Sequence, residues 1–100
     1  MNKYLIIDQN DNVAVALKDI FKGEIVHNIT IKNDIKVGHK FALKNIQKGE
    51  NIIKYGYPIG HAKSDIEAGA WVHSHNLETN LNSIEKYEFC KVFEKINSIK

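Results

Sequence analysis

The sequence lacks arginine, and it contains one cysteine, one proline and one tryptophan. A single cysteine cannot form an internal disulfide, and one thiol cannot build a zinc cluster by itself. Without arginine, no side chain can hold a phosphate or a guanine edge through two parallel hydrogen bonds. The 14 basic residues are lysines, balanced by 12 acidic residues and spread along the chain. We therefore expect no binding to nucleic acid.

Long apolar runs are also missing. No run approaches the about 20 residues that a membrane-spanning helix needs. The first residues pass directly into an apolar alternation, without the charged and then apolar layout of a signal peptide. The hydrophobic fraction of 43% and the charged fraction of 26% are ordinary for a globular protein. The sequence predicts a soluble, cytoplasmic protein with no membrane partner.

A chain of 100 residues has room for one compact domain with one core. A domain of this size buries only roughly 60 to 65% of the surface of its unfolded chain. A deep cleft lined by its own residues would weaken that core, so we expect any site to be shallow or shared with another chain.

One nine-residue pattern recurs along the chain. Residues 16–24 and 42–50 are identical at seven of nine positions, and residues 62–70 form a more diverged third copy. Each copy keeps an alanine, an Asp or Asn three residues later, then an isoleucine and a glycine. A single copy could be a generic helix ending, but three copies in one register favour a repeated structural unit.

The pattern predicts a turn that leads into a strand. Asp or Asn can accept a backbone hydrogen bond, the isoleucine can fill the core, and glycine can adopt the positive φ that ends the turn. The residues after each glycine are apolar and mostly β-branched, as in strands, at 25–27, 52–54 and 71–73.

Further strands are expected at 4–7, 13–17, 29–31 and 40–43, separated by polar turn segments. Short strands with many turns indicate a mainly β domain, folded over on itself rather than stacked as a solenoid. Residues 56–60 form the remaining break, either a plain loop or a flexible wall around a small molecule.

We divide the chain into a β domain at residues 1–80 and a C-terminal helix or linker at residues 81–100. In the second segment Asn82 and Glu85 resemble a capping box, and apolar residues follow at helical spacing. Such a helix could pack on the domain, link it to another, or bind a partner.

His73 and His75 are the main candidates for chemistry. On a strand or at its end, two histidines separated by one residue lie on the same face, with Cα atoms about 6.6 Å apart. Two such imidazoles can converge on one metal ion, and Asn76 could add an amide oxygen. The alternative is an accidental pair of exposed rings that bond to backbone.

His39 and Lys40, which follow Gly38, form a second candidate. They offer a proton carrier and a cation, a pair that suits a carboxylate, although a hairpin turn with two solvated side chains explains them equally well. His27 and His61 are expected at the surface. The sequence has no phosphate-binding glycine loop and no catalytic triad order, so nucleophilic catalysis is not supported.

Taken together, these segments resemble the SAF domain of the altronate and galactarate dehydratase family, which includes the small subunit of sulfolactate sulfo-lyase. The resemblance covers roughly residues 10 to 80. It is carried by Gly38-His39-Lys40-Phe41-Ala42-Leu43, Ile46-x-x-Gly49-Glu50, Tyr55-Gly56-x-x-Ile59-Gly60-x-Ala62, Ile66-x-x-Gly69-x-x-Val72-His73 and His75-Asn76.

The resemblance implies a β-clip fold and a large partner domain or subunit that carries much of the active site. It also implies β-elimination from a sugar acid with a divalent metal, iron(II) or manganese(II). A base must then remove the proton beside the carboxylate, and an acid must assist the departing group. Because the chain ends at Lys100, where long family members continue, we expect a free-standing small subunit or an excised domain.

The resulting hypothesis is the small subunit or N-terminal domain of a hydro-lyase. His73 and His75 would be catalytic or metal-binding, and His39, Lys40 and Asn76 would bind the sugar-acid substrate. One alternative is a non-catalytic module that binds a carbohydrate acid or serves assembly. Another is a structural cap that forms a homo-oligomer.

Overall fold

The computed structural model describes residues 2–79, and their fold is mainly β. The strands form three antiparallel sheets, with the orders β1-β2-β5-β8, β3-β4 and β6-β7-β9. Their bounds are β1 Tyr4–Leu5, β2 Val13–Ala16, β3 Ile25–Val26, β4 Ile29–Thr30, β5 Lys40–Ala42, β6 Asn51–Lys54, β7 Tyr57–Ala62, β8 Trp71–Val72 and β9 Leu77–Glu78. The prediction of a mainly β domain is confirmed.

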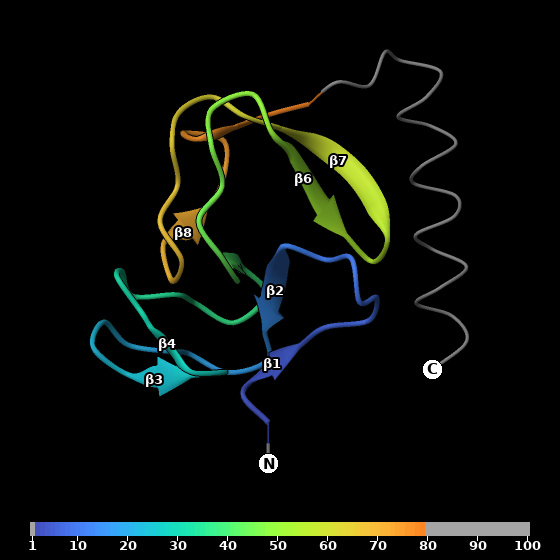
Figure 1. Cartoon of the computed structure of the whole chain (residues 1–100). Coiled ribbons are helices and arrows are strands. Elements are labelled where there is room, and N and C mark those ends of the chain that lie inside the picture. Colours follow the sequence, from blue (N-terminus) through green and yellow to red (C-terminus); the bar gives the residue numbers. More distant parts are fainter. Residues whose placement is uncertain (1, 80–100) are drawn as a thin grey trace.

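The β3-β4 and β6-β7 hairpins lie at opposite ends of the molecule, with β2 between them (Figure 1). Among residues 2–79 there is no helix that is long and apolar enough to cross a membrane. The helix or linker predicted at residues 81–100 lies outside the described residues.

Residues 56–60, predicted to be a break, belong mostly to β7. The turn comes earlier, at Tyr55 and Gly56, whose φ angles of 55° and 79° suit a two-residue hairpin loop. Pro58 is tolerated inside β7 because that part of the strand pairs only with β6, and β9 joins further along at His61.

The repeated turn occurs four times in the described chain, once more than the sequence analysis found. The turn units are residues 16–24, 31–39, 42–50 and 62–70, and we call them units one to four. The glycine of each has a φ between 86° and 94°, and the residue after it donates a hydrogen bond to the carbonyl three residues earlier. This is the geometry of a type II turn. Unit two was missed because Ile31 replaces the alanine at its first position.

The turn units associate in two reciprocal pairs. The central isoleucines of units one and two, Ile20 and Ile35, exchange both backbone hydrogen bonds at 2.8 and 2.7 Å. Units three and four repeat this exchange through Ile46 and Ile66, also at 2.8 and 2.7 Å. Each unit therefore satisfies the backbone groups of its central isoleucine through its partner.

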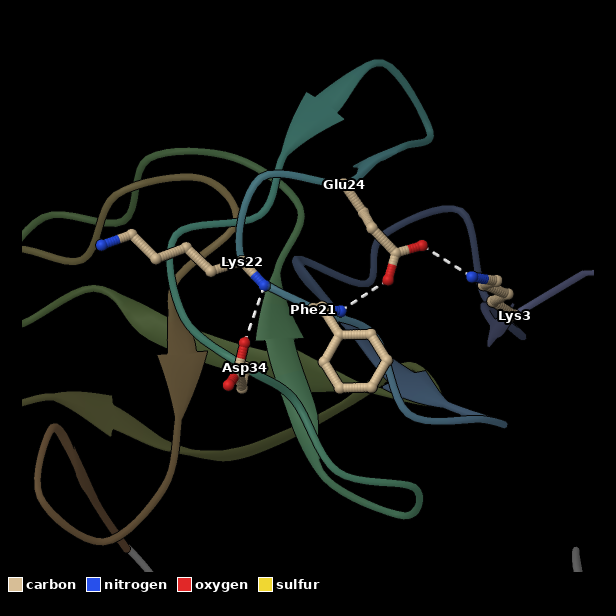
Figure 2. A network of polar contacts seen from close by, with 5 residues as sticks. All are labelled: Lys3, Phe21, Lys22, Glu24 and Asp34. Carbon is tan, nitrogen blue, oxygen red and sulfur yellow. Dashed lines mark hydrogen bonds and ion pairs between the residues drawn. The ribbon is translucent and has the colours of Figure 1, made fainter.

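The Asp or Asn of each unit caps its partner rather than its own turn, which corrects the local cap predicted from sequence. Asp34 of unit two accepts the backbone N–H of Lys22 in unit one at 2.9 Å (Figure 2). The reciprocal bond joins Val37 N–H to Asp19 at 3.0 Å, and Asn45 and Asp65 act in the same way in the second pair. The repeated Asp or Asn thus links each unit to its partner.

Units one and three carry an additional lock, a glutamate directly after the glycine. Glu24 accepts the N–H of Phe21 at 2.6 Å and also bonds to Lys3, at 2.6 Å (Figure 2). Glu50 accepts the N–H of Gln47 at 2.9 Å in the same manner. Units two and four have His39 and Ala70 at this position.

The four central isoleucines are buried, with exposed fractions of 0 to 3%, and the sequence predicted this for Ile20, Ile46 and Ile66. They are divided between two clusters on the two faces of the four-stranded sheet. Ile46 and Ile66 pack with Val13 and Val72, whereas Ile20 and Ile35 pack with Phe41. Burying an isoleucine contributes about 1.5 to 3 kcal/mol, so the paired units anchor both halves of the core.

Candidate substrate-binding site

Trp71 is the centre of the largest aromatic group in the described structure. It lies on β8, opposite Phe41 of β5, and its backbone N–H donates to the Asn33 side chain at 3.0 Å. Alternation along β8 places Val72 in the core and leaves the Trp71 indole half-buried on the other face. The indole is thus held at the point where unit two meets β8.

Three histidines gather around this indole. His73 stacks on it at 5.2 Å between ring centroids and 9° between ring planes, and His75 lies at 5.0 Å. His39 accepts the indole Nε1–H on Nδ1 at 3.2 Å, and its ring centroid lies 5.5 Å from that of His73. We call Trp71, His39, His73 and His75 the Trp71 cluster. The structure therefore brings together the two histidine motifs that the sequence offered separately.

The polypeptide turns immediately after β8. The strand ends at Val72, before either histidine, so strand spacing does not set the distance between the His73 and His75 rings. Asn76 closes the turn: its Oδ1 accepts the N–H of His73, and its Nδ2 donates to the carbonyl of Trp71, both at 2.9 Å. The imidazoles of His73 and His75 are exposed, whereas Asn76 is buried. Asn76 positions the histidines, and its predicted contact with substrate stays a prediction.

A shallow hollow opens beside the Trp71 cluster. It has a volume of about 220 Å³ and is lined by Asp34, Lys36, His39 and Trp71. Trp71, Asp34 and Lys36 were not among the predicted site residues. The available signal was the only tryptophan of the chain, placed two residues before a histidine pair.

Comparison with known proteins agrees with the sequence pattern. The sequence model of the altronate/galactarate dehydratase SAF domain matches residues 2–80. The chain belongs to this SAF domain family. The resemblance inferred from the motifs is confirmed.

The relatives of this SAF domain differ in length. It is 46% identical over 99 residues to the altronate dehydratase of Bacillus subtilis (strain 168), and 46% identical over 98 residues to that of Escherichia coli (strain K12). These matches cover 95% and 94% of the SAF domain chain but 20% of each enzyme. The (2R)-sulfolactate sulfo-lyase subunit alpha of Paracoccus pantotrophus is 47% identical over 51 residues, or 51% of this chain and 76% of that subunit.

Lys40 of the SAF domain lies apart from the Trp71 cluster. It is the first residue of β5 and stands opposite Val15 and Val72, so it shares their face of the sheet, whereas Phe41 and Trp71 lie on the other face. Burial lowers the pKa of Lys40, and burial together with the Lys40 charge lowers the pKa of Lys54. The predicted His39 and Lys40 pair is therefore divided between the two faces of the sheet.

The remaining histidines of the SAF domain also lie outside the Trp71 cluster. His27 occupies the β3-β4 turn, where its Nδ1 lies 3.1 Å from the Tyr4 hydroxyl. His61 lies on β7, with Nε2 3.9 Å from Glu78.

A resident metal ion would need more ligands than the described residues bring together. Within residues 2–79 no three His, Cys, Asp or Glu side chains are placed to hold one ion. His73 and His75 could supply two imidazoles, which make a weak site alone. Any iron or manganese site would therefore need ligands beyond those that residues 2–79 bring together.

Proposed function

We propose that this SAF domain supplies the Trp71 cluster to a lyase active site that a larger catalytic partner completes. The observation that carries the proposal is the convergence of His39, His73 and His75 on one indole. The family match supports an association with a lyase, and the chain spans about a fifth of the length of the altronate dehydratases that it matches. We retain the β-clip assignment and the cytoplasmic location as parts of this proposal.

We propose a sugar acid as the substrate, which the relatives and the chemistry of the cluster support. Elimination of water from a hydroxy acid breaks a C–H bond beside the carboxylate and a C–O bond at the next carbon, and forms a carbon–carbon double bond. Imidazole is suited to both proton transfers. We assign His73 and His75 to moving the proton from carbon to the departing hydroxyl, which leaves as water, and His39 to binding the carboxylate.

The metal-assisted form of this reaction is also part of the proposal. A divalent ion, iron(II) or manganese(II), would neutralise the negative charge that develops beside the carboxylate. In this form His73 and His75 would be metal ligands from this chain instead of proton carriers, and the partner would provide the other ligands and the base. Lys40 and Asn76 remain proposed substrate contacts, although Asn76 already holds the turn and Lys40 lies on the other face of the sheet.

A chimera tests the proposal. The segment of the B. subtilis altronate dehydratase that matches this chain is replaced by this chain, and altronate dehydration is assayed. We expect an active chimera that loses activity with His73→Ala and His75→Ala together and keeps it with Lys18→Gln, an exposed lysine outside the cluster. Parental activity in the double variant would sink the assignment.

A second candidate is a binding module without catalysis. It is favoured by the hollow lined by Asp34, Lys36, His39 and Trp71, whose side chains could contact an acid without a metal ion. This reading predicts that the isolated chain binds a sugar acid equally well with and without a chelator in calorimetry. Binding that disappears with the chelator would contradict it.

A further inference from the structure

The hollow beside the Trp71 cluster has the chemistry of a binding site for a small hydroxy acid. Its lining combines an ammonium group, an imidazole, a carboxylate and an indole, from Lys36, His39, Asp34 and Trp71. An ammonium and an N–H donor suit a carboxylate, an aspartate can accept from a hydroxyl, and an aromatic face suits the carbon chain. With about 220 Å³ the hollow is smaller than the about 300 to 1,000 Å³ usual for enclosing a ligand. Part of a bound acid would stay uncovered and accessible to a partner.

Local backbone geometry brings Lys36 and His39 to the same place. They are the first and fourth residues of the type II turn of unit two, closed by the His39 N–H to the Lys36 carbonyl at 3.0 Å. Gly38 makes this turn possible with its φ of 86°. Asp34 is held two residues earlier by its bond to Lys22 N–H.

Trp71 determines which nitrogen of His39 carries the proton. The indole Nε1–H can only donate, so the Nδ1 atom that receives it, at 3.2 Å, must be unprotonated. In the neutral imidazole the proton is therefore on Nε2, which becomes a hydrogen-bond donor.

The repeated units show what is special about His39. At its position, units one and three have Glu24 and Glu50, whose carboxylates close their own turns at 2.6 and 2.9 Å. Unit two lacks this lock and directs a ring to Trp71 instead. Unit four also lacks the glutamate, with Ala70 at this position, so unit two is set apart by the ring that it places against the indole. Such a departure from a repeated pattern is expected where function imposes another requirement.

We propose that this hollow binds the carboxylate of a small hydroxy acid through Lys36 and the Nε2–H of His39, and that Trp71 is a positioning residue that holds His39 in the required tautomer. The inference rests on the proposed function for the class of ligand. It assigns the cation that acts with His39 to Lys36, on the same face as the indole, in place of Lys40.

Nuclear magnetic resonance of the ¹⁵N-labelled chain tests both parts. The ¹⁵N shifts of His39 should show the Nε2–H tautomer. Titration with altronate at millimolar concentrations should move the His39 and Trp71 side-chain signals, acetate should move them less, and the uncharged polyol sorbitol should leave them in place. A His39 protonated on Nδ1, or no response to altronate, would overturn the inference.

Variants separate the individual roles. Lys36→Gln should weaken altronate binding about tenfold, because a charge-assisted contact is lost at a partly solvated site. Lys18→Gln removes the same charge at an exposed position away from the hollow and should leave binding unchanged. Trp71→Phe keeps a ring but removes the N–H donor, so His39 should show a mixture of tautomers.

Other results contradict these assignments. Equal affinity in Lys36→Gln and in the parent chain would remove Lys36 from the site, and an unchanged tautomer in Trp71→Phe would remove the positioning role. These results can be distinguished from failure of the proposed function. A chain that binds altronate in the hollow, together with an active chimera that tolerates loss of His73 and His75, would refute only the assignment of these two histidines to the lyase reaction.

Discussion

Replacing Asn76 by alanine should destabilise the domain, because its side-chain amide is buried and bonded at both ends. The Asn76 side chain is 8% exposed and makes two hydrogen bonds of 2.9 Å, one to His73 N–H and one to the Trp71 carbonyl. Leaving a buried polar group without its partner costs about 1 to 3 kcal/mol. We therefore expect Asn76→Ala to lower the free energy of unfolding by about 2 kcal/mol, a large share of the stability of a small domain.

Asn45→Ala is the matched control, because Asn45 is exposed and accepts a single hydrogen bond, from Ala68 N–H at 2.9 Å. Its loss should cost about 1 kcal/mol or less, since water can replace the acceptor. Both variants are compared by urea denaturation followed by circular dichroism, with equal m-values required for the comparison. If Asn76→Ala lost no more stability than Asn45→Ala, Asn76 would not be holding the histidine turn as described.

Three further predictions concern the core and two charged residues. Ile46→Ala should lower the free energy of unfolding by about 2 to 5 kcal/mol, whereas Ile25→Ala, at a position 71% exposed, should change it by less than about 0.5, both read from urea denaturation. The hydrogen bond from Lys3 lowers the pKa of Glu24, so ionised Glu24 stabilises the folded state above about pH 4.3, and this stabilisation is lost as the pH falls further. Glu24→Gln should therefore make the free energy of unfolding fall less steeply with decreasing pH. An equal slope in the variant and the parent chain would contradict this. Burial lowers the pKa of Lys40, so keeping the ammonium charged destabilises the folded state at neutral pH, and this cost is relieved as the pH rises through the lowered pKa. Lys40→Met should therefore raise the melting temperature at pH 7, and a fall would indicate a stabilising partner for the ammonium.

The β class and the turn unit could be predicted because they depend on local properties. Glycine at a fixed position in a repeated pattern indicates a positive φ, and its constant spacing from the isoleucine indicates one buried position in each unit. The partner of each cap could not be predicted in this way. Asp34 bonds to Lys22 in another unit, and nothing local to either residue shows that the two units pair.

The candidate site was predicted in part. The sequence contained His39, His73 and His75, but only the pairing of β5 with β8 brings His39 beside Trp71. His39 precedes β5 and closes the type II turn of unit two, so its separation from Lys40 depends on that turn and on the bond to Trp71 and could not be predicted from strand alternation. The end of β8 at Val72 could not be predicted from the sequence, because it depends on two hydrogen bonds made by the buried side chain of Asn76.

The most direct test of the account uses the only tryptophan of the chain as a reporter. Altronate is titrated into the isolated chain while Trp71 fluorescence is recorded, with sorbitol as the uncharged control. If the Trp71 cluster forms the acid-binding part of the site, altronate should produce a saturable change in emission that His39→Gln weakens and sorbitol does not reproduce. A response to altronate and sorbitol alike, or no saturable response, would contradict the account.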